Sequence, residues 1–233
     1  MIANKNIAPE GSGGGSRFEA AKSRRVVLQW TAGAAAALVL FGGRLPNFGI
    51  SSALAADLGE GDIGVLNYAY ALEQLEAAFY TKVIDAPYAA MSDDEKAILT
   101  DIRDHEKAHV DFLKTALADK AIPDLDVDFS KVDFTSREAV LTTAKTFEDL
   151  GVAAYNGAGK LIQNGDYLLA AGRIVSVEAR HAATIRDLLQ PGSVAFSGPD
   201  VVDKNGLDGA LEPAKVLAAA DPFIKTDVTA NGL

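Results

Sequence analysis

The feature that most constrains this fold is a set of four long segments in which apolar residues recur at helical spacing. The segments are residues 62–85, 92–119, 135–164 and 166–190. Helices of this length are about 35–40 Å long. No strand-like alternation of comparable length competes with them, so the sequence predicts an all-α protein.

Residues that start and stop helices bound the four segments. Asp62 is the expected N-cap of the first. The second and third begin with capping-box patterns, in which a hydroxyl and an acidic side chain satisfy free backbone N–H groups. The pattern residues are Ser92-Asp93-Asp94-Glu95 and Thr135-Ser136-Arg137-Glu138. Helix-stopping residues are Pro87 after the first segment, Asn164-Gly165 after the third and Pro191-Gly192 after the fourth.

The connections between the segments predict their topology. Short loops join the first to the second and the third to the fourth, so each pair should form an antiparallel hairpin. About 16 residues, 120–135, join the two hairpins, and they could span about 50 Å when extended. That is enough to return along the bundle. The sequence therefore predicts a four-helix bundle with one long crossover, the ferritin-like arrangement.

Composition excludes several classes of function. The chain has no cysteine, so a metal must be held by carboxylate and imidazole groups, and a rubredoxin module is excluded. No Gly-x-Ser-x-Gly nucleophile elbow occurs. Residues 56–233 carry a formal charge of −14, because 6 of the 22 Lys/Arg and only 2 of the 32 Asp/Glu precede them. This acidity argues against nucleic acid as a partner.

The first 55 residues differ from the rest and predict an export signal. Their features are a Gly/Ser-rich start at 1–23 that predicts disorder, Arg24-Arg25, an Ala-rich apolar run at 30–43, and Ala53-Leu54-Ala55. Together these resemble a twin-arginine signal cleaved before Ala56, which predicts a periplasmic or other extracytoplasmic location. A retained membrane anchor is the alternative. It is disfavoured because the apolar run is short for a hydrocarbon core of about 30 Å.

Two of the three histidines follow a glutamate by three residues. The pairs are Glu106 with His109 in the second segment and Glu178 with His181 in the fourth. At this spacing both side chains lie on one helix face and can reach one metal ion. A single pair would be weak support, but two pairs on alternate helices indicate a metal site.

The first and third segments supply a matching pattern of glutamate and tyrosine. Glu73 precedes Tyr80 by seven residues, and Glu148 precedes Tyr155 by the same interval. Each of the four glutamates lies near the middle of its helix, so a bundle would bring them to one level. Without cations their crowding should raise the pKa of these carboxyl groups. Two divalent cations would balance four carboxylates, so the sequence predicts two iron or manganese ions bound by Glu73, Glu106, His109, Glu148, Glu178 and His181.

Several neighbouring residues have two interpretations. Glu76 lies one turn beyond Glu73 and is the alternative ligand from the first segment, although only Glu73 repeats the Glu–Tyr spacing. His105 points about 100° away from Glu106 and is interpreted as a surface histidine or a support to the ligands. Tyr80 and Tyr155 are either ordinary core residues or hydrogen-bond donors to the ligands.

Residues 66–80, LNYAYALEQLEAAFY, and 147–158, FEDLGVAAYNGA, resemble the first and third helices of the exported ferritin-like domain family that includes desiccation-related proteins. The resemblance implies a metal–carboxylate bundle with ligands at the positions named above. It divides the chain into a leader at 1–55, a bundle at 56–190 and an irregular extension at 191–233 with a short helix near 211–220. Gly151, Gly157 and Gly159 suggest close packing or a kink beside the site.

Two functions from different classes fit this sequence. One is an oxidoreductase of peroxidase, catalase or ferrous-oxidase type, acting on O2, H2O2 or Fe(II) in stress protection. The other is a non-catalytic metal-binding or structural protein of desiccation or oxidative stress. A closed storage cage fits less well because of the leader and the irregular tail. A homo-oligomer is compatible with the sequence, and membrane contact is expected only through an uncleaved signal.

Replacing Arg24 and Arg25 together by lysine should leave unprocessed precursor in the cytoplasm, because the twin-arginine route requires the arginine pair. Cell fractionation and immunoblotting of the two forms measure this. Normal processing of the double variant would point to another export route.

Overall fold

A computed structural model describes residues 55–233, so the predicted leader, apart from Ala55, lies outside the described residues. The five α-helices are α1 (Gly61–Asp85), α2 (Asp93–Leu117), α3 (Arg137–Ala158), α4 (Gly165–Leu189) and α5 (Pro213–Ala220). Short 3-10 turns are Ala118–Lys120, Gly159–Leu161, Val194–Ser197 and Asp221–Phe223. Two-residue strands β1 (Ala56–Asp57) and β2 (Val228–Thr229) pair in parallel.

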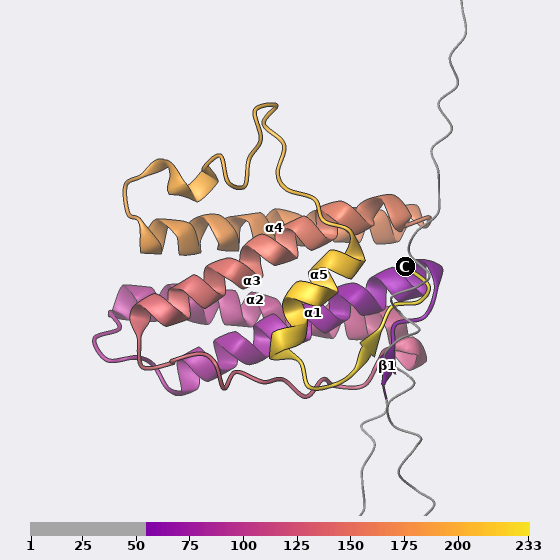
Figure 1. The fold of residues 1–233 in the computed structure, drawn as a ribbon, viewed down its shortest axis with the longest axis horizontal. Coiled ribbons are helices and arrows are strands. Elements are labelled where there is room, and N and C mark those ends of the chain that lie inside the picture. Colours follow the sequence, from indigo (N-terminus) through magenta and orange to yellow (C-terminus); the bar gives the residue numbers. More distant parts are fainter. Residues whose placement is uncertain (1–54) are drawn as a thin grey trace, which may run out of the picture. The chain divides into compact units, whose positions relative to one another are not determined.

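The four long helices form the predicted bundle of two antiparallel hairpins. Helices α1 and α2 make one hairpin and α3 and α4 the other, and the chain between α2 and α3 runs back along the bundle (Figure 1). The prediction of an all-α bundle with one long crossover is confirmed. None of the helices in the described part of the chain is long and apolar enough to cross a membrane.

The helix starts agree with the capping patterns in part. The hydroxyl of Ser92 accepts from the N–H of Glu95 at 3.1 Å, as the pattern predicts. In α3 the N-cap is Ser136, whose hydroxyl accepts from the N–H of Ala139 at 3.2 Å. The predicted cap, Thr135, instead donates to Asp133 at 2.6 Å, so that prediction was one residue early.

Asp62 does not cap the first helix, contrary to the sequence prediction. Helix α1 starts one residue earlier, and its N-cap is Glu60. The carboxylate of Asp62 accepts from the backbone N–H groups of Gln163 and Asn164, at 2.7 and 2.9 Å, in the loop between α3 and α4. A tertiary contact therefore takes the side chain that a local rule would assign to the helix end.

The crossover is fixed to α1 by buried amide side chains. Asn67 accepts from the N–H of Ile122 at 2.9 Å and donates to the carbonyl of Lys120 at 2.9 Å. Two turns further on, Gln74 accepts from the N–H of Leu125 at 2.8 Å. These bonds satisfy backbone groups of an irregular segment that would otherwise be left without partners in the protein interior.

The C-terminal extension packs back onto the bundle, and α5 lies across α3 (Figure 1). The N–H of Leu211 donates to the carbonyl of Ala153 in α3 at 2.9 Å. A Cβ atom at Gly157 would lie only 1.8 Å from the carbonyl oxygen of Leu211. Glycine at this position therefore lets the extension approach the helix backbone. Helix α3 ends soon after, at Ala158, six residues before the predicted end.

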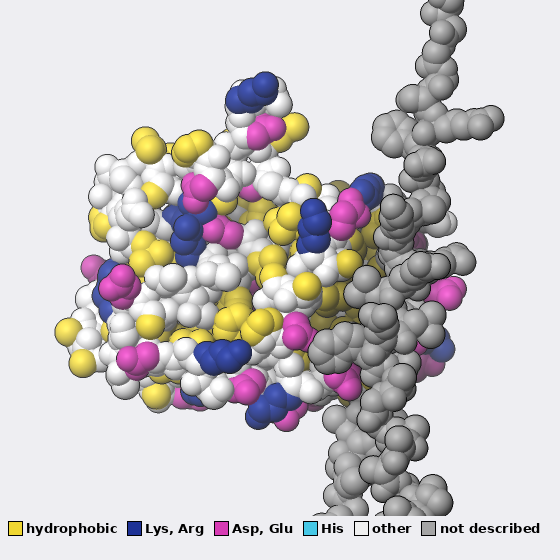
Figure 2. Space-filling view, in the orientation of Figure 1, with side chains coloured by type: hydrophobic (Ala, Val, Ile, Leu, Met, Phe, Trp, Pro, Cys, Tyr) yellow, Lys and Arg dark blue, Asp and Glu magenta, His cyan; other side chains and the backbone are white. Residues whose placement is uncertain are grey.

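The face of the bundle that carries α5 has acidic, basic and apolar side chains interspersed (Figure 2). No histidine is visible on the part of this face that Figure 2 leaves uncovered. The ring of His105 has 46% of its side-chain surface exposed. That exposed ring therefore does not belong to the visible part of this face.

Gly157→Ala should lower the stability of the protein by about 2 kcal/mol or more, because the new methyl group meets backbone atoms that cannot rotate away. Gly172→Ala in α4 is the matched control, since nothing lies within 4 Å of its Cβ position. The control should be neutral or stabilising by about 0.5–1 kcal/mol. Thermal melting of both variants measures the difference, and equal melting temperatures would contradict the packing argument.

Candidate metal centre

The bundle brings all six sequence-predicted ligands to one level of its interior. Helices α1 and α3 contribute Glu73 and Glu148, whereas α2 and α4 each contribute a glutamate and the histidine three residues later. All four glutamate side chains are fully buried. Burial of four carboxylates in one place is costly unless cations or protons balance their charge.

These residues form two groups of four that share two members. One group is Glu73, Glu106, His109 and Glu178, and the other is Glu106, Glu148, Glu178 and His181. Within each group the candidate ligand atoms all lie within 4.8 Å of one another. Glu106 and Glu178 belong to both groups, so each can bridge two positions. The sequence predicted the six residues together but gave no sign of which two would be shared.

The imidazole rings face the carboxylates through their Nδ1 atoms. His109 Nδ1 lies 2.9 Å from Glu178 and 3.2 Å from Glu73. His181 Nδ1 lies 2.8 Å from Glu106 and 3.5 Å from Glu148. Each histidine is thus nearest to the glutamate that precedes the other histidine, so the two hairpins contribute to the site in equivalent ways.

The tyrosines of the Glu–Tyr pattern bond across the site. The hydroxyl of Tyr80 on α1 donates to Glu148 on α3, and the hydroxyl of Tyr155 on α3 donates to Glu73 on α1, both at 2.5 Å. Burial raises the pKa of both hydroxyls well above the usual value of 10, so they stay protonated and remain donors. Of the two interpretations of these residues, the structure shows hydrogen-bond donors to the carboxylates.

Six buried polar atoms of this cluster make no well-aligned hydrogen bond, although imidazole nitrogens and carboxylate oxygens approach one another closely here. They are both carboxylate oxygens of Glu106, both of Glu178, Oε2 of Glu148 and Nδ1 of His181. Buried polar atoms are normally paired, and here the atoms without a well-aligned bond converge on one another. Carboxylate oxygens and imidazole nitrogens are also the ligands that iron and manganese accept in proteins. The residues therefore fit a pair of metal ions.

Glu76, the alternative ligand from α1, belongs to neither group of four. Its side chain is buried and lies against α3, where a Cβ atom at Gly151 would come within 3.1 Å of its Oε1. The close packing expected beside the site thus occurs at Gly151, which leaves room for a fifth carboxylate. Burial, followed by the repulsion of Glu106 and Glu148, raises the pKa of Glu76 well above 4.5.

His105 lies closer to the site than its sequence position suggested. Its Nδ1 is 3.0 Å from Nε2 of His181, the ring nitrogen that faces away from the carboxylates. The two ring planes differ by 11° and the ring centroids are 5.2 Å apart, which fits two rings joined edge to edge by this bond. Of the two interpretations of His105, the structure shows a partner of a predicted ligand. The sequence around His105 gives no sign of this contact, because the contact depends on where α4 lies.

The electrostatics of the metal-free cluster differ from residue to residue. Burial lowers the pKa of His109 and His181, but hydrogen bonds to the glutamates more than offset this and raise both to about 12. Burial raises the pKa of Glu148 to about 8, and burial with the repulsion of Glu178 and Glu106 raises that of Glu73 well above 4.5. Protonated imidazoles and neutral carboxyls therefore balance the charge when no cation is bound.

Glu106 departs from the expectation that crowding raises the pKa of these carboxyls. Burial raises its pKa, but close contacts with the imidazoles of His109 and His181 outweigh burial and lower it to about 2. The sequence expectation was therefore wrong for this residue. It considered repulsion among carboxylates and left out the two imidazoles that the fold places next to this one.

Four helices that each contribute a buried carboxylate, two of them with a histidine three residues later, define a class of bundles with carboxylate–histidine metal centres. A family model described as a ferritin-like domain matches residues 61–191, from the start of α1 to just beyond α4. The chain therefore belongs to the ferritin-like domain family. A search of curated proteins found no match.

The metal-free protein should melt at a higher temperature at pH 5.5 than at pH 8.5. The raised pKa of Glu148 stabilises the folded protein fully below about pH 4.5, and this stabilisation is lost as the pH rises through about 8. The raised pKa values of His109 and His181 act in the same direction, because their stabilisation is lost as the pH rises from about 6.5 to about 12. The lowered pKa of Glu106 matters only below about 4.5. Melting in the presence of a chelator measures this, and an equal or higher melting temperature at pH 8.5 would contradict it.

Glu148→Gln and Glu106→Gln should affect the metal-free protein in opposite ways. The amide of Glu148→Gln replaces a carboxyl that is largely neutral at pH 7, and Tyr80 can still donate to it, so stability should be retained or increased. Glu106→Gln removes the charged carboxylate between two protonated imidazoles and should cost about 3 kcal/mol or more. Denaturant unfolding at pH 7 compares the variants. Equal losses would show that these two glutamates have the same charge in the metal-free protein.

Proposed function

We propose that this protein holds two iron or manganese ions and acts on O2 or peroxide, or oxidises Fe(II), as part of stress protection outside the cytoplasm. The observation that supports this best is the pair of four-residue groups that share Glu106 and Glu178. Two groups with two common carboxylates suit a pair of ions, for which Glu106 and Glu178 would both be ligands, rather than one isolated ion.

The proposed ligand set divides evenly between the two ions. Glu73 and His109 would belong to one ion and Glu148 and His181 to the other, with Glu106 and Glu178 between them. Two divalent ions balance the charge of these four carboxylates and replace the protons that balance it in their absence. When bound, such ions supply Lewis acidity and exchangeable electrons at an oxygen ligand.

The side chains around the proposed ligands have roles of their own. Tyr80 and Tyr155 hold one oxygen of Glu148 and Glu73, respectively. The second oxygen of each carboxylate faces an imidazole of the cluster, His181 for Glu148 and His109 for Glu73. His105 contacts Nε2 of His181, the ring nitrogen that faces away from the site. This contact orients the His181 ring so that its own Nδ1 is directed at the site. The full burial of the glutamates keeps bulk water away from the cluster. The arrangement thus orients the donors before any ion binds.

The extracytoplasmic location is the part of this proposal that rests on sequence motifs alone. The paired arginines, apolar run and Ala-x-Ala motif lie at residues 24–55, ahead of the described bundle. A protein that acquires its metal while folding in the cytoplasm would suit export in the folded state.

The purified protein, reconstituted anaerobically with Fe(II) or Mn(II), should bind about two metal ions per chain. Elemental analysis of the desalted protein measures this, and protein purified after native export shows which metal it acquires in the cell. Oxygen uptake and peroxide consumption then test turnover. Two bound ions without turnover would favour the non-catalytic metal-binding protein, and absence of bound metal would contradict the proposal.

His105→Ala should weaken metal binding about 10-fold or more, because loss of a partner to a ligating histidine commonly has an effect of this size. Lys107→Ala is the matched control, since it removes an exposed side chain two residues away on the same helix. Competition with a coloured chelator measures both affinities. An affinity for His105→Ala equal to that of the control would show that the contact with His181 does not support binding.

A further inference from the structure

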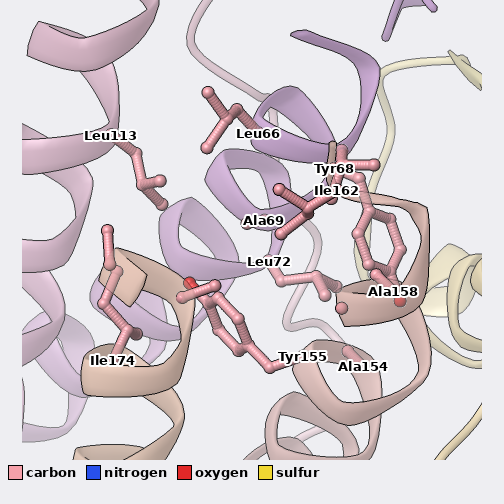
Figure 3. A pocket seen from close by; sticks show the side chains of 14 residues that line it. Leu66, Tyr68, Ala69, Leu72, Leu113, Ala154, Tyr155, Ala158, Ile162 and Ile174 are labelled. Carbon is pink, nitrogen blue, oxygen red and sulfur yellow. The ribbon is translucent and has the colours of Figure 1, made fainter. Parts of the chain in front are cut away.

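A small apolar pocket lies among the four long helices, beside the ring of Tyr155 (Figure 3). Its volume is about 20 Å3, enough for one small apolar molecule. Its lining includes Ala69 and Leu72 of α1, Leu113 of α2 and Ile174 of α4. No polar atom contributes to the pocket surface. A pocket of this kind stays dry unless an apolar molecule occupies it.

The inner wall of the pocket is formed by neighbours of the proposed metal ligands. Leu72 directly precedes Glu73, Leu113 lies one turn beyond His109, and Ile174 lies one turn before Glu178. The ring of Tyr155 lines the pocket, and its hydroxyl donates to Glu73. The pocket and the group of Glu73, His109 and Glu178 are therefore one helical turn apart.

The outer wall of the pocket is formed by small residues near the start of α4. Ala170 and Ala171 line the pocket and are partly exposed to solvent. The two residues before them, Leu168 and Leu169, are 47% and 65% exposed. An exposed apolar surface on α4 thus precedes the pocket along the chain.

We propose that this pocket is a binding site for dioxygen and the route by which dioxygen reaches the metal centre. Dioxygen makes no strong hydrogen bonds with water, so its transfer from water into an apolar pocket costs little free energy. Hydrogen peroxide would lose its hydrogen bonds to water in this pocket, and hydrated Fe(II) would lose its water ligands. No group in the pocket lining replaces them, so entry of either is unfavourable. The inference rests on the proposed function and narrows its oxidant to dioxygen.

Xenon tests the pocket in the metal-free protein, because it is apolar and occupies cavities of this kind. Xenon-dependent changes in the NMR spectrum should be centred on Leu72, Leu113 and Ile174. They should disappear in Ala171→Leu and in Ala69→Leu, which place side-chain atoms in the pocket. They should persist in Ala183→Leu, the control, which adds the same atoms to α4 at a partly exposed residue outside the lining. Absence of xenon binding to the wild-type protein would overturn the assignment.

Stopped-flow oxidation of the Fe(II)-loaded protein tests the route. Ala171→Leu should slow oxidation by O2 at least 10-fold and leave oxidation by H2O2 within twofold of the wild-type rate. Ala183→Leu should change neither rate. Ala69→Leu provides a second filled pocket if Ala171→Leu folds poorly, and melting curves check folding of all three variants.

The outcomes separate this inference from the proposed function. Unchanged O2 oxidation in the filled variants, or equal slowing with both oxidants, would overturn the dioxygen route and leave the metal centre intact. Oxidation of the wild-type protein by H2O2 but not by O2 would do the same. Failure of the wild-type protein to bind metal would contradict the proposed function instead, and xenon binding would then decide alone whether the pocket accepts an apolar gas.

Discussion

The burial of four glutamates at one level of the bundle is the constraint on which the rest of the structure depends. Each carboxylate would be unstable there alone, so each has a specific partner nearby. These are Tyr80 for Glu148, Tyr155 for Glu73, and two imidazoles for both Glu106 and Glu178. Long helices hold these partners in place. The apolar turns on either side of the cluster exclude water from it.

The two hairpins contribute equivalent parts to the centre, but their surroundings differ. His105 contacts the Nε2 atom of His181. Among the residues that the structure describes, no histidine contacts the ring of His109 in the same way. The apolar pocket is lined by residues close in sequence to Glu73 and His109, such as Leu72 and Leu113. The two groups of four therefore have similar members but different neighbours.

The C-terminal extension and the crossover stabilise the bundle from outside the ligand helices. Asn67 secures the crossover, and Gly157 admits the backbone of the extension to α3. Arg186 of α4, which is buried, bonds Asp149 of α3 and Asp200 of the extension. These contacts tie the second hairpin to the chain that follows it, so that the level of Glu148 relative to Glu178 is maintained.

The sequence by itself determined the four helices, the crossover and the six residues of the centre, because helical periodicity and Glu-x-x-His spacing are local properties. Only the tertiary structure decided that Glu106 and Glu178 are shared, that Tyr80 bonds Glu148 rather than its neighbour Glu73, and that His105 meets His181. It also decided that Asp62 binds the α3–α4 loop. Those outcomes depend on which helices lie opposite one another, and residues far apart in the chain acquire their partners only when the hairpins pack.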